Sequence, residues 1–142
     1  MALICDTGPL YAAMDVADRD HVRCLEFFTA RAEELVVPAP VLVELAWLAS
    51  SRLGISPFEA FLGDISGGSV RVTDLVLDDY WRVGQLMRQY SDLPLDFVDA
   101  AVLAVTERLR EPELVTLDHR HFSVVRPKHV PYLTLQPSLA QD

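Results

Sequence analysis

Four acidic residues stand where predicted strands end or predicted helices begin. Asp6 directly follows a short apolar run, and Asp118 directly follows another. Glu44 lies in the first turns of a predicted helix that follows a strand, and Asp99 lies in the first turn of a later helix. Carboxylate oxygens are the ligands that Mg²⁺ and Mn²⁺ prefer, and such an ion supports phosphoryl-transfer chemistry. The four acids are therefore candidates for one metal-dependent catalytic site.

Electrostatic repulsion within such a site would itself favour a bound cation. Several carboxylates within a few ångströms of one another bind protons unless a cation lies among them. A helix N-terminus favours an anion by about 0.3 to 1 kcal/mol, which helps Asp99 and Glu44 to ionise but does not suffice. We therefore expect Mg²⁺, or Mn²⁺, at the site, where it can activate a water molecule for in-line attack on a phosphodiester.

Each acid also has a purely structural interpretation. Asp6 could cap a short helix that follows it, and Asp99 could form a capping box with Asp96. Asp118 could be a turn residue, and Glu44 could be an exposed surface acid. Any one of these alternatives is credible alone, but the joint placement of the acids at strand ends and helix starts favours a shared site.

The elements that would position these acids alternate along the chain. Apolar runs predict strands at 2–5, 35–38, 70–72, 114–117 and 132–135. Helical spacing of apolar residues predicts helices at 20–32, 40–53, 56–65 and 77–90, and a further buried helix capped by Asp96. Alternation of this kind predicts parallel strands joined by crossover helices, hence a three-layer α/β/α fold with a central parallel sheet. Ligands of such sheets bind beyond the carboxyl ends of the strands, where the acids fall.

Composition limits the class of protein. The 142 residues, 51% of them hydrophobic, suit a single domain with one core. The net charge of −9 argues against binding a polyanion by bulk electrostatics. If the protein binds a polyanion, a metal ion or a local arginine patch would have to neutralise the repulsion between them. The sequence shows neither a membrane span nor a signal peptide, which predicts a cytoplasmic protein. Cys5 and Cys24 are expected to be reduced core thiols.

Four stretches carry a resemblance to a known family. They are the N-terminal strand with Asp6-Thr7, PVLVELAWL with Glu44, DFVDAAVLAVTERL with Asp99, and ELVTLDHRHF with Thr116, Asp118 and Phe122. In these stretches the chain resembles PIN-domain proteins of the VapC toxin type, the ribonuclease half of a bacterial toxin–antitoxin pair. The resemblance covers essentially the whole chain and implies a single PIN domain over residues 1–142.

The resemblance also implies roles for the acids. Asp6 and Asp99 would be the most direct Mg²⁺ ligands, and Asp118 would bind the ion directly or through water. Glu44 would bind metal-bound water or a second ion.

Other residues near the acids are assigned supporting roles. The resemblance implies that Thr7 and Thr116 hydrogen-bond the carboxylates or the phosphate. Asp96 is an additional acid close to Asp99, and its position favours a capping role. Arg120 stands where the family often has an acid, and it could contact phosphate instead. The remaining histidines of this stretch, on either side of Arg120, are expected at the rim near RNA or in solvent.

The resemblance implies an Mg²⁺-dependent endoribonuclease that cuts structured RNA such as tRNA or ribosomal RNA. The products would carry a 5′-phosphate and a 3′-hydroxyl. A homodimer through the helices of residues 40–65 is expected, as is a VapB-type antitoxin whose C-terminal segment inserts an arginine near the metal. The competing hypotheses are a non-catalytic PIN-like scaffold and, with less support, a phosphoacceptor receiver domain. Trp47 and Trp81 are expected to pack rather than to stack on bases.

Overall fold

Strands and helices alternate along residues 1–138, the part of the chain that the computed structural model describes. The strands are β1 (Ala2–Cys5), β2 (Glu34–Pro38), β3 (Val70–Thr73), β4 (Glu113–Val115) and β5 (Thr134–Gln136). The helices are α1 (Thr7–Met14), α2 (His21–Ala30), α3 (Ala39–Leu53), α4 (Ser56–Ser66), α5 (Leu77–Gln89), α6 (Phe97–Leu109) and α7 (His119–Phe122). Within this described part, no helix combines the length and the apolar character needed to cross a membrane.

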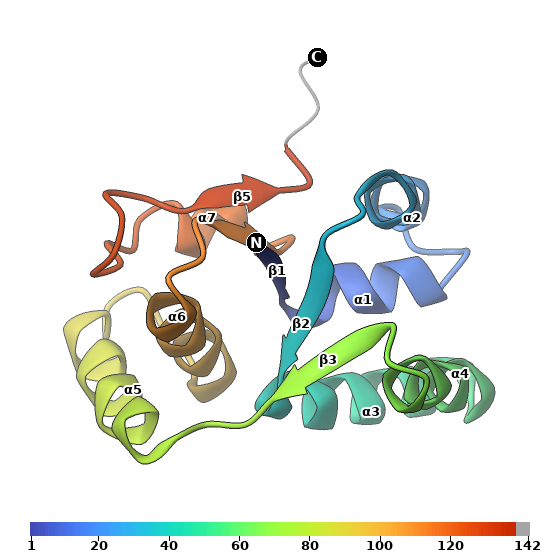
Figure 1. Cartoon of the computed structure of the whole chain (residues 1–142), viewed down its shortest axis with the longest axis horizontal. Helices are drawn as coiled ribbons and strands as arrows, with labels where there is room; N and C mark the ends of the chain where they lie inside the picture. The colour runs from blue at the N-terminus through green and yellow to red at the C-terminus, as the bar shows by residue number, and fades with distance from the viewer. Residues whose placement is uncertain (139–142) are drawn as a thin grey trace.

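The five strands form one parallel sheet in the order β3-β2-β1-β4-β5. Its register pairs Leu3 with Leu35 and Ile4 with Leu114, so β1 lies between β2 and β4 at the centre. Helices α5 and α6 cover one face, and α1 to α4 lie on the other (Figure 1). The expected three-layer α/β/α fold with a central parallel sheet is confirmed.

Burial is greatest in the central strand and in one helix. Every residue of β1 is buried, as its continuous apolar run requires in a sheet covered on both faces. The segment from Ala100 to Glu107 of α6 is buried on all sides, and α6 contacts both β1 and β2. Cys5 and Cys24 are buried free thiols, as expected. The core thus fixes the carboxyl end of β1, where Asp6 begins the next segment.

The structure corrects several expected boundaries. Strand β4 ends at Val115, two residues early, because Thr116 leaves the strand to hydrogen-bond other loop groups. The four-residue helix α7 that follows was not predicted, and β5 begins later than expected. Helix α4 begins at Ser56, as predicted, and no side chain caps its first turn.

The expectation that Trp47 and Trp81 pack in the interior is wrong. Their exposed fractions are 71% and 70%. The buried residues of α3 are Val41, Leu45 and Ala49, which recur every four positions along one face. Trp47 lies two residues beyond Leu45, about 200° around the helix, and so projects outward.

Two ion pairs join α5 to α6. Arg82 forms a bidentate pair with Glu107, with both N–O distances 2.8 Å, and the Glu107 carboxylate is largely buried. Arg108 pairs with Asp79 at 3.0 Å, and the Asp79 side chain is also buried. Removal of one partner from such a pair leaves a charge that is buried without compensation.

Replacement of Arg82 by alanine is therefore expected to lower the free energy of unfolding by about 3 kcal/mol. Arg71→Ala is the matched control, because its pair with Glu34 is about half exposed and contributes less than about 1 kcal/mol. Urea unfolding followed by circular dichroism measures both losses. Equal losses in the two variants would contradict the assignment of a stabilising role to the α5–α6 pair.

Candidate active site

Asp6 lies buried at the end of β1, with 7% of its surface exposed. One carboxylate oxygen, Oδ1, accepts a hydrogen bond of 2.8 Å from the backbone N–H of Thr7, so Asp6 caps helix α1. The other oxygen, Oδ2, accepts a bond of 2.9 Å from the Thr116 hydroxyl. The backbone N–H of Asp6 donates to the Val115 carbonyl at 2.8 Å. These bonds fix the carboxylate relative to both β1 and β4.

Thr116 connects two of the candidate acids. Its hydroxyl donates to Asp6 and accepts a bond of 3.0 Å from the backbone N–H of Asp118. Its own backbone N–H donates to the Gln136 carbonyl at 2.8 Å. The Thr116 hydroxyl can join Asp6 to Asp118 because a hydroxyl both donates and accepts hydrogen bonds. Thr116 therefore sets the position of Asp118 relative to Asp6, although 110 residues separate Thr116 from Asp6 in sequence.

Asp118 caps helix α7 and pairs with a histidine that sequence reasoning left without a specific role. Its Oδ1 accepts a bond of 3.1 Å from the His121 backbone N–H. Its Oδ2 lies 2.6 Å from Nδ1 of the His121 ring. The ring of His119 lies against the Thr116 carbonyl at 3.0 Å. The spacing of three residues between Asp118 and His121 is the only sequence signal that could have indicated this pair.

Asp99 and Asp96 form a capping box at the start of α6. The backbone N–H of Asp99 donates to Oδ1 of Asp96 at 2.9 Å, and the Asp96 N–H donates to Oδ2 of Asp99 at 3.4 Å. The capping role expected for Asp96 is confirmed. Asp99 is half-buried in the first turn of α6, the helix packed against β1 and β2.

The charges of the candidate acids act on one another and on their pKa values. Burial raises the pKa of Asp6 to about 6; hydrogen bonds from Thr7 and Thr116 oppose this rise, and the charges of Glu44 and Asp118 add to it. Burial also raises the pKa of Asp99 to about 8, with the charges of Asp96 and Asp6 adding to the rise. The structure thus places Asp6 within electrostatic reach of carboxylates from three other segments of the chain, those of Glu44, Asp99 and Asp118.

The donor chemistry of this cluster suits a hard divalent cation. The groups around Asp6 are oxygen donors, which suit Mg²⁺ or Mn²⁺ better than zinc. The Thr7 hydroxyl oxygen is buried and has no hydrogen-bond partner within residues 1–138, which leaves it available to a bound group. As the described side chains stand, however, no three His, Cys, Asp or Glu side chains are grouped closely enough to hold one ion. Coordination would therefore require a local shift of the carboxylates.

An apolar hollow of about 770 Å³ opens beside Glu44. Helix α3 lines one wall, and the start of α5 and of α6 line the other. Its walls include Pro40, Val43, Trp47, Tyr80 and Phe97, with Glu44 and Asp74 as its acids. The sequence did not predict this hollow, because its residues come from three helices and from the segment before α5, which only the fold brings together.

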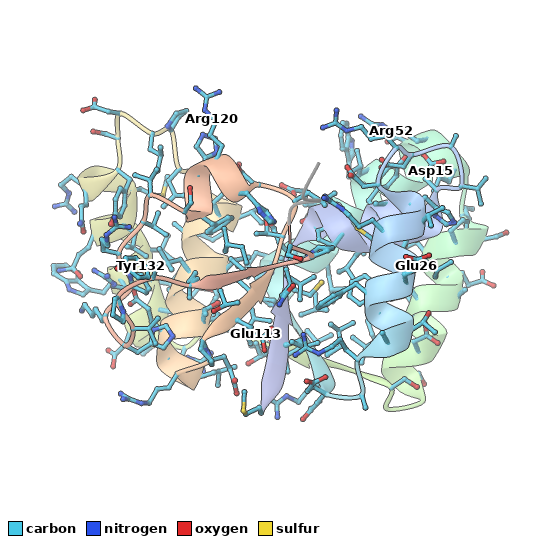
Figure 2. The ribbon with its side chains drawn as sticks, turned by 90° about the horizontal axis from the view of Figure 1, so that it is seen from above. Asp15, Glu26, Arg52, Glu113, Arg120 and Tyr132 are labelled. Atoms are coloured by element: carbon cyan, nitrogen blue, oxygen red, sulfur yellow. The ribbon has the colours of Figure 1, made fainter. Side chains whose placement is uncertain are left out.

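Arg120 lies exposed on α7, two residues after Asp118. Figure 2 shows its side chain at the edge of the molecule, directed away from the core. Among the sequence-predicted residues, it is the one cation next to the acids.

These features define a class: an α/β protein with an acidic cluster at the carboxyl ends of its central parallel strands. The chain belongs to the PIN domain family, whose model matches residues 3–127. It is 32% identical over 125 residues to Ribonuclease VapC26 of Mycobacterium tuberculosis, an alignment that covers 88% of this chain and 93% of that protein. Nucleases of this family generally use a divalent metal ion.

Solved structures support the same fold at lower identity. A VapC20 toxin of Mycobacterium tuberculosis, described as cleaving the sarcin–ricin loop, matches with a TM-score of 0.77 and 18% identity over 84% of this chain and 92% of that one. A toxin–antitoxin complex from Klebsiella pneumoniae matches with a TM-score of 0.67 and 19% identity, and the match covers 94% of this chain and 100% of that one. VapBC2 from Rickettsia felis, bound to a promoter DNA fragment, matches with a TM-score of 0.67 and 16% identity, and the match covers 96% of this chain and 98% of that one.

The raised pKa values predict how stability depends on pH without metal. The folded chain keeps protons on Asp6 and Asp99 well above the ordinary pKa of 3.8, so it binds more protons than the unfolded chain. Their contribution to stability is therefore complete at low pH and is lost as pH rises toward about 8. In EDTA, the free energy of unfolding of Asp99→Asn should be higher than that of the wild type at pH 8. At pH 5 the two values should lie closer together.

Glu26→Gln, on the exposed side of α2, is the matched control and should show no such pH-dependent gain (Figure 2). Urea unfolding at the two pH values measures the difference. If Asp99→Asn raised the free energy of unfolding equally at pH 5 and pH 8, the gain would not come from relief of charge repulsion at this residue.

Proposed function

We propose that the protein is an endoribonuclease that hydrolyses phosphodiester bonds in RNA as the toxin of a type II toxin–antitoxin system. The observation that carries the proposal is the buried carboxylate of Asp6, repelled by the charges of Glu44 and Asp118 and in turn repelling Asp99. A PIN-family relative named as a ribonuclease, 32% identical over most of the chain, supports it.

In this proposal the acids of the site share one divalent ion, Mg²⁺ or in its place Mn²⁺. Asp6 and Asp99 would hold it most directly, Asp118 directly or through water, and Glu44 through water or a second ion. When bound, the ion would supply an activated water and would stabilise negative charge on the leaving oxygen. Repulsion among the carboxylates, which raises the pKa of Asp6 and Asp99, would be relieved by the same charge.

The chain's own groups would position the acids and the phosphate. Thr116 keeps Asp6 and Asp118 at a fixed separation, and His121 orients the Asp118 carboxylate. The Thr7 hydroxyl is free to donate to a phosphate oxygen or to a ligand of the ion. Arg120 would contact a phosphate from the exposed side. Hydrolysis would leave a 5′-phosphate and a 3′-hydroxyl.

Structured RNA, such as tRNA or ribosomal RNA, is the substrate that we propose. A structural neighbour is described as cleaving the sarcin–ricin loop, which supports this class. The net charge of −9 disfavours non-specific binding along long stretches of RNA. It favours binding through a few local cations and the metal. We place the activity in the cytoplasm and treat residues 1–142 as a single PIN domain, although residues 139–142 lie outside the described part.

A VapB-type antitoxin is the protein partner that we propose. Two structural neighbours are described as toxin–antitoxin assemblies, which supports such a partner. The acidic cluster would attract a basic antitoxin segment, whose arginine would neutralise the same carboxylates that the metal does. Family membership disfavours the receiver-domain hypothesis, and a non-catalytic scaffold remains the alternative that a cleavage assay decides.

The purified chain is expected to cleave total RNA with Mg²⁺ and not with EDTA. Asp6→Asn should lower the rate about 100-fold or more, because it removes a charge at the centre of the site. Asp78→Asn, an exposed acid of α5, is the control and should cleave like the wild type. Sequencing of the RNA ends tests for 5′-phosphates. A folded wild type that leaves RNA intact under both conditions would favour the scaffold.

We also propose that a second copy of the chain docks on the face around the hollow beside Glu44. Val43, Trp47 and Tyr80 are exposed on this face, and a monomer rarely exposes such a cluster without a function. Trp47 projects from the same face that contains the hollow. In a two-fold dimer each copy could therefore insert Trp47 into the hollow of the other, since such interfaces are self-complementary.

Trp47→Ala is expected to weaken the homodimer at least about tenfold, as the loss of a central aromatic anchor does. Trp81→Ala is a closely matched control, because Trp81 is equally exposed but lines a different, mixed-charge hollow. Sedimentation velocity over a concentration series measures both. A monomeric wild type, or equal effects of the two changes, would contradict this interface.

A further inference from the structure

Many arginines of this acidic protein are already bound to carboxylates. Ion pairs occupy Arg19, Arg23, Arg31, Arg71, Arg82 and Arg108. A cation paired in this way offers little attraction to a phosphate. The arginines that could bind RNA are therefore those that the fold leaves without a carboxylate partner.

Arg52 is such a residue, and the fold holds it in a defined place. It is exposed in the last turn of α3 and forms no ion pair with any carboxylate of residues 1–138. Its guanidinium carbon lies 5.4 Å from the centre of the Tyr11 ring. Tyr11 is itself fixed, because it is buried and its hydroxyl donates to Oδ2 of Asp15 at 2.6 Å. The bond from Tyr11 is the main cause of the lowered pKa of nearby Asp15, and the charge of Arg52 adds to it.

A guanidinium stacked on an aromatic ring keeps its N–H edge available for other acceptors. Such an edge matches two oxygens of a phosphate, and the stacking reduces the side-chain entropy lost when one binds. Tyr11 lies on α1, the helix that Asp6 caps. The support of Arg52 is thus part of the element that begins at the central acid.

The position of Arg52 suits a strand that crosses the acidic site. Glu44 and Arg52 are both on α3, eight residues apart, which corresponds to about 12 Å along the helix. This length spans about three or four nucleotides of a stacked strand. Figure 2 shows Arg52 and Arg120 at the same edge of the molecule, on opposite sides of the central strands.

We propose that Arg52, supported by Tyr11, binds a phosphate of the RNA strand a few nucleotides from the bond that is cut, on the side of the acids opposite Arg120. This inference rests on the proposed ribonuclease function and adds a path for the substrate: the strand enters over one arginine, passes the acidic cluster and leaves over the other. It also explains how a chain of net charge −9 can bind RNA at one edge.

The test uses a fluorescein-labelled single-stranded RNA of mixed sequence, with Mg²⁺ and the Asp6→Asn change to prevent cleavage. Affinity is measured by anisotropy over a range of salt concentrations. Arg52→Gln should weaken binding about fivefold. It should also reduce the slope of log affinity against log salt by about 0.7, the value of one phosphate contact on a single strand. Arg52→Lys should keep the slope and lose part of the affinity.

Arg71→Gln is the matched control, because it removes the same charge from an exposed arginine that is paired with Glu34 on the sheet. It should change neither affinity nor slope. Equal slopes in Arg52→Gln and its parent, with RNA cleavage intact in the wild type, would overturn this inference alone. A wild type that neither cleaves nor binds RNA would overturn the proposed function, and this inference with it.

Discussion

The burial of one carboxylate among others is the constraint on which the rest of the structure depends. Asp6 is almost inaccessible, yet the charges of Glu44 and Asp118 act on it. Two donated hydrogen bonds, from the Thr7 backbone and the Thr116 hydroxyl, hold it in place. They offset only part of the effect of burial, since the pKa of Asp6 remains raised. The site is therefore poised to accept positive charge, whether from a metal ion or from a partner's arginine.

Such a site needs a rigid frame, and the fold provides one through its centre. The acids approach from different segments, so their geometry is as stable as the packing of β1, β4 and α6. Strand β1 and the segment of α6 from Ala100 to Glu107 are buried, and two ion pairs attach α5 to the outer side of α6. Hydrophobic burial across the sheet offsets the repulsion that the acids introduce at its edge. The buried segments of β1 and α6 thus stabilise the fold, and the acids of the site lie at the ends of the same elements.

The surface around the acids is divided by chemistry. The wall formed by α3 with the starts of α5 and α6 is apolar and exposes Trp47 beside a hollow, as expected of a protein interface. The edge that carries Arg120 and Arg52 presents two exposed arginines that form no ion pair within residues 1–138. In the proposed function, a protein would therefore approach the site from one direction and RNA from another. Helix α3 takes part in both, because it carries Glu44, Trp47 and Arg52.

The sequence by itself determined the layered α/β fold, the order of the elements and the candidate acids. Burial of a strand, amphipathic spacing and helix capping are local patterns, so Asp6 after an apolar run and Asp96 three residues before Asp99 could be read directly. Only the tertiary structure decided that Thr116 bonds to Asp6 and that Trp47 points outward beside a hollow. Those features depend on distances between segments that are remote in the chain and on which face of a helix meets the sheet. Local residue patterns do not contain that information, because packing of the whole core selects it.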